Sequence, residues 1–196
     1  MAKAFKNGRK GISGQLESQE RDLLRNLFAD LISLLEPETP GHEDPLAALI
    51  GVDMDVRAPS DPALKRLLPD VVRDDGDAAL EFRQLTERSL RETKIGALRA
   101  ASLTLESERI VLTGEAPKLW AMALNDVRLV LAERLEIRDE QDAERVHELH
   151  DWSQAEDVDS YLSLVYNFVS WLQEGLVQAM LEDLPGGGRE DEGHRM

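Results

Sequence analysis

Cysteine is entirely absent from this sequence of 196 residues. A chain without cysteine has no disulfide framework, no thiolate nucleophile, no zinc-finger thiolates and no thiol that an oxidant could switch. Aromatic residues are also scarce, at 5% of the chain, so leucine and alanine must fill most of the core. These absences exclude disulfide scaffolds and enzymes that use a cysteine nucleophile.

Long uninterrupted apolar runs are missing as well. The longest apolar stretch, residues 161–181, contains Asn167, Gln173, Glu174 and Gln178, whose polar groups would be costly to place in hydrocarbon. Residues 1–14 carry basic side chains but no apolar run of the kind that a secretory signal needs. We therefore expect no membrane association and a cytoplasmic location.

Basic residues are few compared with acidic ones. The chain has 39 acidic and 23 basic side chains, and therefore a formal net charge of −16. Such a charge keeps a protein soluble and repels nucleic acid and anionic membranes at long range. Any binding of DNA must therefore depend on a local basic patch.

Apolar periodicity predicts a mainly α-helical, bundle-like single domain over residues 1–184. The clearest helix covers residues 18–36 and ends before Pro37. Asp44-Pro45 and Asp61-Pro62 can each begin a short helix, because aspartate can cap a helix and proline suits its first turn. Pro185 and three glycines end the last helix, so we predict a disordered tail at residues 185–196. The further predicted helices cover residues 45–50, 63–68, 114–135 and 159–184.

Two segments carry β signals. Asn7-Gly8 lies between apolar residues and predicts a short hairpin over residues 3–16. Residues 109–113 are rich in β-branched side chains and could form a further short strand that pairs with this hairpin.

Two other segments are predicted from their polar residues. Thr86 can cap a new helix after one that carries Leu80, Phe82 and Leu85, which predicts a helix, turn, helix unit. Residues 136–159 hold ten acidic and two basic side chains and few apolar ones, which is typical of a solvated, mobile connector.

No catalytic or metal-binding motif is visible. His147 and His150 do not follow the His-Glu-x-x-His pattern of zinc proteases, and histidines in an acidic connector are usually solvated. The glycines at 186–188 lack the lysine of a phosphate loop, and no serine lies in a Gly-x-Ser-x-Gly elbow. We predict that the protein is not an enzyme and binds no metal, cofactor or small-molecule substrate.

Two basic segments are candidates for contact with DNA. The first has no acidic residue before Glu17 and could reach phosphates from a hairpin, and the second lies on the helix after Thr86. Glu87 and Glu92 interrupt the second segment, so the alternative interpretation is an ordinary charged solvent face. Convergence of the two segments on one face of the protein would favour DNA binding, and scattering of their cations among carboxylates would count against it. The candidate residues are Lys3, Lys6, Arg9, Lys10, Arg88, Arg91 and Lys94.

Two further groups have candidate structural roles. Asn125, Asp126 and Arg128 lie within an apolar helix, where polar residues usually satisfy one another or a nearby backbone, so we predict a structural polar network. The last helix is apolar around most of its circumference, which indicates burial on several sides or a homodimer interface. Its interface candidates are Phe168, Trp171, Leu172 and Leu176.

Several segments, in this order along the chain, resemble one known family. They are Asp61–Asp70, Glu81–Thr86, Leu90–Lys94, Leu124–Leu131 and Trp171–Glu174. Together they resemble the actinobacterial domain-of-unknown-function family that includes the AosR-type oxidation-sensing transcription regulators and is often encoded beside the adaptor protein ClpS. The resemblance extends over nearly the whole chain up to residue 184.

The resemblance implies an atypical regulator that is associated with DNA, and with a sigma factor or RNA polymerase, at genes of cysteine synthesis and oxidative-stress defence. A regulator that senses oxidant through a pair of cysteines cannot do so here, because this chain has none. We therefore predict a non-enzymatic transcription regulator without a cysteine redox switch. The alternative is a protein-interaction module or adaptor in Clp-linked protein turnover.

Overall fold

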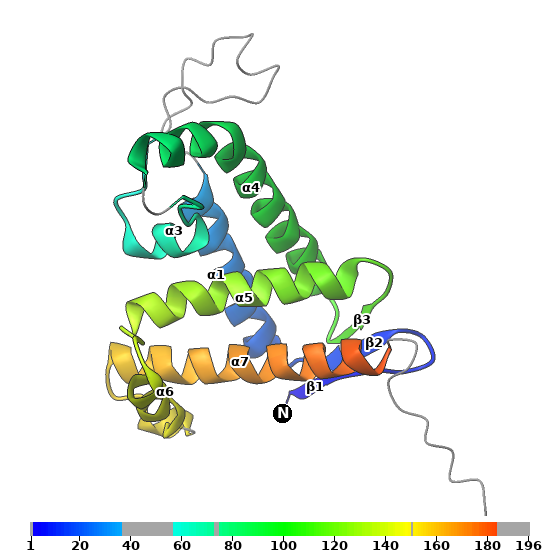
Figure 1. Cartoon of the computed structure of the whole chain (residues 1–196). Coiled ribbons are helices and arrows are strands. Elements are labelled where there is room, and N and C mark those ends of the chain that lie inside the picture. The colour runs from blue at the N-terminus through cyan, green and yellow to red at the C-terminus, as the bar shows by residue number, and fades with distance from the viewer. Residues whose placement is uncertain (1, 37–56, 73–74, 150, 184–196) are drawn as a thin grey trace, which may run out of the picture.

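Helices dominate the computed structural model, which describes residues 2–36, 57–72, 75–149 and 151–183 (Figure 1). A small sheet lies at one end of the helical body, and a short 3-10 turn at 152–154 precedes the last helix. The prediction of a mainly α single domain is confirmed. The α-helices are α1 (Ser18–Leu35), α3 (Pro62–Leu67), α4 (Gly76–Thr104), α5 (Ala116–Arg134), α6 (Glu140–His147) and α7 (Val158–Glu182).

The sheet has three antiparallel strands in the order β1 (Lys3–Lys6), β2 (Ile12–Gln15) and β3 (Arg109–Leu112). Ile12 pairs with Leu112 and Gln15 pairs with Arg109, so the distant strand β3 continues the N-terminal hairpin. This confirms both the hairpin and its pairing with the later strand.

The core is centred on Trp120 of α5, which is almost completely buried. The rings of Phe5 and Phe28 meet the Trp120 ring edge-on at centroid distances of 5.2 and 6.0 Å, an arrangement favoured by the charge distribution of aromatic rings. The indole Nε1 of Trp120 donates a hydrogen bond of 2.9 Å to the Thr104 hydroxyl, so its polar atom is satisfied. One aromatic cluster therefore joins β1, α1, α4 and α5.

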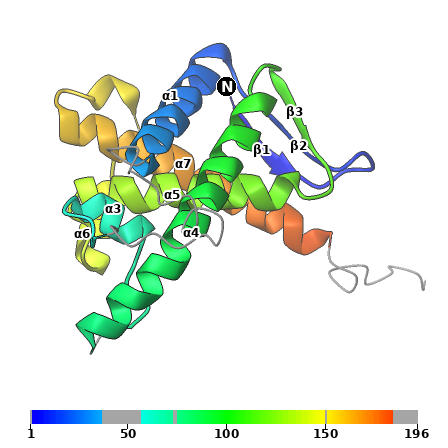
Figure 2. The same cartoon turned by 90° about the horizontal axis from the view of Figure 1, so that it is seen from above.

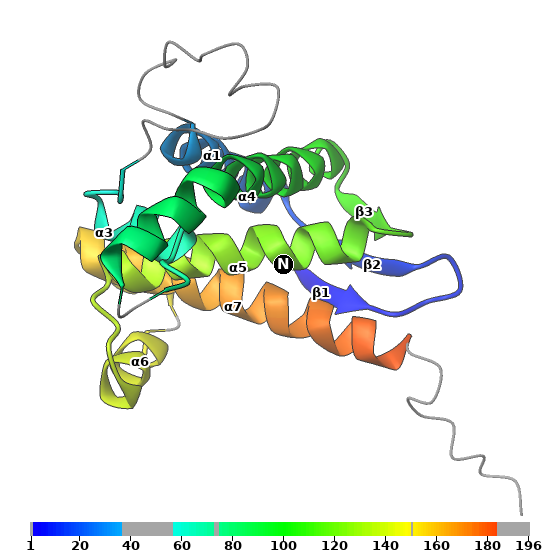
Figure 3. The ribbon, with the colours of Figure 1, turned by 45° about the horizontal axis from the view of Figure 1, so that its top comes forward.

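Helices α5 and α7 run side by side beneath α1 and α4 (Figures 1 and 3). At Gly175, α7 comes so close to β1 that a Cβ atom on this glycine would lie 2.9 Å from the Cβ of Ala4. It would also lie 3.4 Å from the backbone nitrogen of Phe5. The missing side chain at Gly175 therefore lets α7 lie against the backbone of β1.

Replacing Gly175 with alanine is expected to lower the free energy of unfolding by about 1 to 2 kcal/mol, because overpacking costs more than the gain in helix propensity. Gly96→Ala is the matched control, since a Cβ there meets nothing within 4 Å. That change should raise the free energy of unfolding by about 0.5 to 1 kcal/mol. Urea titrations of the two variants measure both effects, and a stabilised Gly175→Ala protein would contradict the close approach.

Residues 76–104 form one helix of 29 residues, so the prediction of a helix, turn, helix unit is wrong. The Thr86 hydroxyl donates a hydrogen bond of 2.8 Å to the carbonyl of Phe82 one turn earlier, and it therefore does not cap a new helix. Asp75 is the true N-cap, with its carboxylate accepting from the backbone nitrogens of Asp77 and Ala78.

The acidic segment 136–159 is also more ordered than predicted, since it contains α6 and the 3-10 turn. Several of its acids are explained by capping: Asp139, Asp151 and Asp157 each accept a hydrogen bond from a backbone nitrogen at the start of a helix. Val146 is buried, and the Asn167 amide donates to its carbonyl at 2.8 Å. The number of charged residues predicted a mobile connector because it does not show which acids cap helices or which residues contact α7.

Helix α3 is held against α5 by Glu133. Its carboxylate accepts hydrogen bonds of 2.9 Å from both terminal nitrogens of Arg138 and one of 2.7 Å from Arg66 on α3. These bonds, those of Arg138 first, lower the pKa of Glu133 to about 2. A group with a lowered pKa contributes stability that is present above its unfolded value of 4.5 and is lost as the pH falls toward 2.

Glu133→Gln is therefore expected to lower the free energy of unfolding by about 1 kcal/mol at neutral pH, a value reduced for solvent screening. The difference between the variant and the parent should become smaller as the pH falls from about 4.5 toward 2, because the Glu133 carboxyl is then increasingly protonated. Urea unfolding at a series of pH values measures the difference. A constant difference across the whole range would contradict this account.

Two sequence predictions, the short helix at 45–50 and the tail at 185–196, lie outside the described residues. Among the described helices, none is both long and apolar enough to cross a membrane.

Candidate functional site

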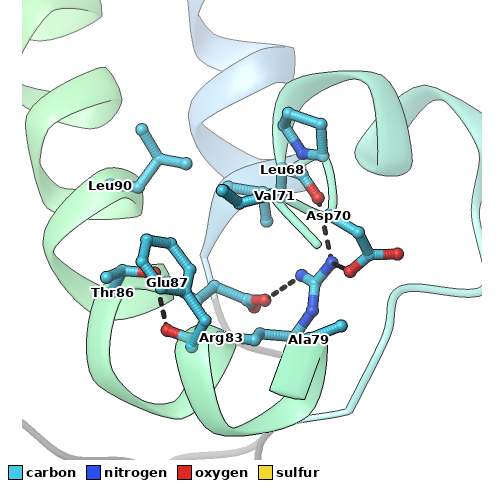
Figure 4. A pocket seen from close by; sticks show the side chains of 10 residues that line it. Leu68, Asp70, Val71, Ala79, Arg83, Thr86, Glu87 and Leu90 are labelled. Carbon is cyan, nitrogen blue, oxygen red and sulfur yellow. Dashed lines mark hydrogen bonds and ion pairs between the residues drawn. The ribbon is translucent and has the colours of Figure 1, made fainter. Parts of the chain in front are cut away.

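A buried network of charges lies where the first half of α4 meets the loop that follows α3 (Figure 4). Arg83 is at its centre, with only 7% of its side chain exposed. The guanidinium forms an ion pair of 2.6 Å with Asp70, donates 3.1 Å to the carbonyl of Leu68 and pairs with Glu87 one turn along α4. Burial alone would lower the pKa of Arg83, but the hydrogen bonds that it donates to Asp70 and Glu87 raise this pKa above its usual value.

Glu87 extends this network to α1. Its second carboxylate oxygen pairs with Arg91 at 2.7 Å, and Arg91 donates 2.6 Å to the carbonyl of Leu35, the last residue of α1. A helix leaves its final carbonyls without partners, so Arg91 satisfies a group that would otherwise face the interior unpaired. Arg83, Glu87 and Arg91 thus tie together α1, α4 and the loop after α3.

A second buried pair connects α4 to α5. Lys94 lies 2.6 Å from Asp126, and their side chains are 14% and 2% exposed. Burial raises the pKa of Asp126 even though the hydrogen bond and charge of Lys94 oppose the shift. The other carboxylate oxygen of Asp126 is buried without a hydrogen-bond partner among the described residues.

The segments that carry the family resemblance meet in these two clusters. Leu68 and Asp70 come from the first segment, Arg83 and Glu87 lie in or beside the second, and the pair of Lys94 and Asp126 joins the next two. Several of the residues that carry the resemblance therefore form buried ion pairs that hold the helices together.

A hollow of about 200 Å³ opens beside Arg83 (Figure 4). Its walls are mostly apolar, and its charged lining is limited to Asp70, Arg83 and Glu87, which already pair with one another. We refer to it as the α4 hollow. It is lined by Leu68, Pro69, Asp70, Val71, Ala79, Phe82, Arg83, Thr86, Glu87 and Leu90.

The two basic segments do not converge. The hairpin lies beside the C-terminal end of α7, whereas the first half of α4 extends from the opposite end of the molecule (Figures 1 and 2). Arg91 and Lys94 are engaged in the buried pairs described above, so we no longer assign them to DNA contact, and Arg88 forms an exposed pair of 3.1 Å with Glu92. The spacing of basic residues along a helix does not distinguish an exposed basic face from cations that pair with carboxylates on other helices.

The hairpin itself remains a candidate for contact with an anion. Lys3, Lys6, Arg9 and Lys10 are all exposed, and within the described residues none of them forms an ion pair. The hairpin is attached to the helical body because β1 packs against α7, and Asn7 also donates an exposed hydrogen bond of 3.3 Å to Asp183, just after α7. The hairpin therefore presents four exposed cations that have no ion-pair partner in the part of the chain that the structure describes.

The predicted polar network is divided between separate partners. Asp126 pairs with Lys94, while Arg128 donates 2.8 Å to Gln173 and lies 5.5 Å from the centre of the Tyr166 ring. Asn125 is exposed to solvent.

The candidates for an oligomer interface on α7 include both buried and exposed residues. Leu172 and Leu176 are fully buried in the core of the single chain, so they are not available to a partner. Phe168 packs against the core and stacks on Trp171, which is partly exposed. Contacts with α5, α6 and the sheet bury part of the apolar circumference of α7, whereas Tyr161, Trp171, Val177 and Leu181 remain at least 40% exposed.

Comparison with known proteins connects this geometry to a family. Residues 2–180 match the sequence family DUF2017, which is described as a domain of unknown function. The chain is 36% identical over 176 residues to the putative oxidative stress regulator AosR of Mycobacterium leprae (strain TN), covering 81% of this chain and 77% of the relative.

Two further relatives have the same description. The oxidative stress regulators AosR of Mycobacterium bovis (strain ATCC BAA-935 / AF2122/97) and Mycobacterium tuberculosis (strain ATCC 25618 / H37Rv) are each 34% identical over 139 residues, covering 62% of this chain and 64% of the relative. No solved structure matches the chain.

Proposed function

Because the chain belongs to the DUF2017 family, which includes the oxidative stress regulators AosR, we propose that it is a non-enzymatic transcription regulator that contacts promoter DNA through its N-terminal hairpin. The observation that supports this is the group of four exposed cations on the ordered hairpin, Lys3, Lys6, Arg9 and Lys10, which form no ion pair with any described residue. In this proposal a sigma factor or RNA polymerase brings the protein to the promoter, and the hairpin strengthens that complex.

The charge distribution supports contact with the DNA backbone rather than base recognition. With a net charge of −16, the protein is repelled from DNA at long range, so the hairpin can hold only a short stretch of phosphates. On α4, the cations Arg83, Arg91 and Lys94 are paired with carboxylates, which leaves this helix without the basic surface of a recognition helix. Promoter selectivity then has to come from the sigma factor or polymerase.

The regulator also has to respond to oxidative stress without a thiol, because the chain contains no cysteine. In this proposal any sensing of oxidant takes place in its partner. Treatment with diamide, which oxidises thiols, should therefore leave binding by the isolated protein unchanged.

The test is the salt dependence of binding to duplex DNA. If all four cations contact phosphates, the logarithm of the binding constant should fall with the logarithm of the salt concentration with a slope of about −3.6. A variant with Lys3, Lys6, Arg9 and Lys10 all changed to glutamine should lose this slope and most of its affinity. The matched control changes Arg88 and Arg99, two cations on α4, to glutamine and should bind like the parent.

The same quadruple variant should lose retention on promoter DNA in the presence of polymerase and sigma factor. Equal retention of the parent and the quadruple variant would overturn contact through the hairpin. The alternative of an adaptor in protein turnover remains a prediction that no feature of the described residues favours.

A further inference from the structure

Side chains alternate between two faces along strands β2 and β3. Every second residue of these strands is buried, and the residues between them are exposed or partly buried. Successive side chains of a strand point to opposite faces of the sheet, so one face belongs to the core and the other faces solvent. On these two strands the solvent face carries Ser13, Gln15, Arg109 and Val111.

The register of the sheet places a fifth cation beside those of the hairpin. Lys3 pairs with Gln15 on one side of β2, and Gln15 pairs with Arg109 on the other side. Residues directly opposite each other in an antiparallel pair share one face, so Lys3 and Arg109 belong to the same face of the sheet. Two strand spacings separate their backbones by about 10 Å.

An irregularity in β1 keeps a second lysine on this face. Lys3 and Lys6 lie three positions apart, so on a regular strand their side chains would point to opposite faces. The register shifts between them, because their partners Gln15 and Ser13 are only two positions apart. A bulge of this kind re-aims a side chain, and both lysines are exposed. We refer to the outer sheet face, which consists of Lys3, Lys6, Ser13, Gln15, Arg109 and Val111.

The cations of the outer sheet face are available to a ligand. Within the described part of the chain, Lys3, Lys6 and Arg109 are exposed and form no ion pair. The carboxylate of Glu108, just before β3, approaches this face because it accepts a hydrogen bond from the Gln15 side chain. Three cations therefore share the face with one neighbouring carboxylate, in a protein whose net charge is −16.

We propose that duplex DNA lies across the whole outer sheet face, with Arg109 of β3 as a fifth contact to phosphate beside the four cations of the hairpin. This inference rests on the proposed function of the hairpin and extends the contact surface to a strand that comes after α4 in the chain. The hairpin then binds as part of the three-stranded sheet rather than as an isolated arm (Figure 2).

The chemistry of the face suits a duplex better than a single strand. A duplex carries one phosphate charge for about every 1.7 Å of its axis, so cations about 10 Å apart can each reach a separate phosphate. Proteins that bind single strands stack the bases on aromatic side chains. Phe5 is the one aromatic residue of the three strands, and it is buried in the core.

The test is binding of a fluorescent 20-base-pair duplex by the full chain. Arg109→Gln should weaken binding at least fivefold at about 50 mM sodium chloride, because one phosphate contact accounts for about 0.9 of the slope against salt. Arg109→Lys keeps the charge and should restore most of the affinity and the slope. The matched control is Arg99→Gln, an exposed arginine of α4, which should bind like the parent.

A change of the opposite sign gives a second readout. Glu108→Gln removes the carboxylate beside the outer sheet face and should strengthen binding about twofold, as expected for one charge about 10 Å from a phosphate in water. Glu140→Gln changes the net charge equally, but it lies on α6 at the other end of the molecule, so binding should not change (Figure 1). Circular dichroism checks that each variant folds, since all of these side chains are exposed.

The outcomes separate this inference from the proposed function. Parent-like binding by Arg109→Gln, together with loss of binding by the quadruple hairpin variant, would overturn the contact through β3 and leave the hairpin in its role. A parent that does not bind duplex DNA would overturn both. Tighter binding to single-stranded DNA of the same length, or to phosphatidylglycerol vesicles, weakened by Arg109→Gln, would overturn the duplex as the ligand of this face.

Discussion

Replacing Asp126 with alanine is expected to lower the free energy of unfolding by about 3 kcal/mol. The change leaves the ammonium group of Lys94 in an environment where its side chain is only 14% exposed and its partner is gone. An unpaired charge in such a site costs far more than the pair itself contributes. Urea unfolding at neutral pH measures this loss.

The double variant Lys94→Met with Asp126→Leu should behave quite differently. Burial raises the pKa of Asp126 despite the nearby lysine, so the attraction between the two groups does not fully offset the desolvation of the carboxylate. Two apolar side chains of similar volume remove both charges at once. We expect the double variant to match the parent to within about 1 kcal/mol or to exceed it. A double variant as unstable as Asp126→Ala would contradict this explanation.

Replacing Arg83 with methionine should lower the free energy of unfolding by about 3 kcal/mol, because Asp70, Glu87 and the Leu68 carbonyl lose one shared donor. Arg83→Lys should cost nearly as much. Lysine offers a compact charge on a flexible stem, whereas the planar guanidinium presents a rigid fork of donors that can reach three acceptors in different directions.

The matched control for this experiment is Arg99→Lys. Arg99 lies on the same helix and pairs with Glu36 at 3.3 Å, but both side chains are more than half exposed. An exposed pair contributes little, so this change should alter stability by less than about 0.5 kcal/mol. Amide hydrogen exchange adds a local readout, since residues 68–71 should exchange faster in Arg83→Lys and remain protected in Arg99→Lys. Full rescue by lysine at position 83 would contradict the role of the guanidinium fork.

The parts of the fold that were predictable from the sequence are those that depend on local rules. The amphipathic pattern identified α1, the Asn7-Gly8 signal identified the hairpin, and Asp61-Pro62 identified the start of α3. Each signal lies within a few residues of the structure that it predicts. Pairing of β3 with the hairpin was also predicted, because few other segments are rich in β-branched residues.

The errors arose where the decisive partner is distant in the chain. Arg91 and Lys94 look like a basic helical face until Leu35 and Asp126 are placed beside them, 56 and 32 positions away. Thr86 is the exception, because its partner is local: it has the chemistry of a cap, but its hydroxyl donates to the carbonyl of Phe82 within an unbroken helix. Leu172 and Leu176 have the pattern of an interface, but the neighbouring elements bury them within one chain. Sequence periodicity identifies an apolar face without identifying what covers it.

The close approach of α7 to β1 sets the order of events during synthesis on the ribosome. Phe5 belongs to the aromatic cluster around Trp120, and its backbone lies against Gly175, which is made 170 residues later. At 5 to 20 residues per second, roughly 10 to 35 s pass between the two. The part of β1 that lies against Gly175 therefore stays uncovered until α7 emerges, so this surface is exposed for longer than it would be in a helical protein of this size with mostly local contacts.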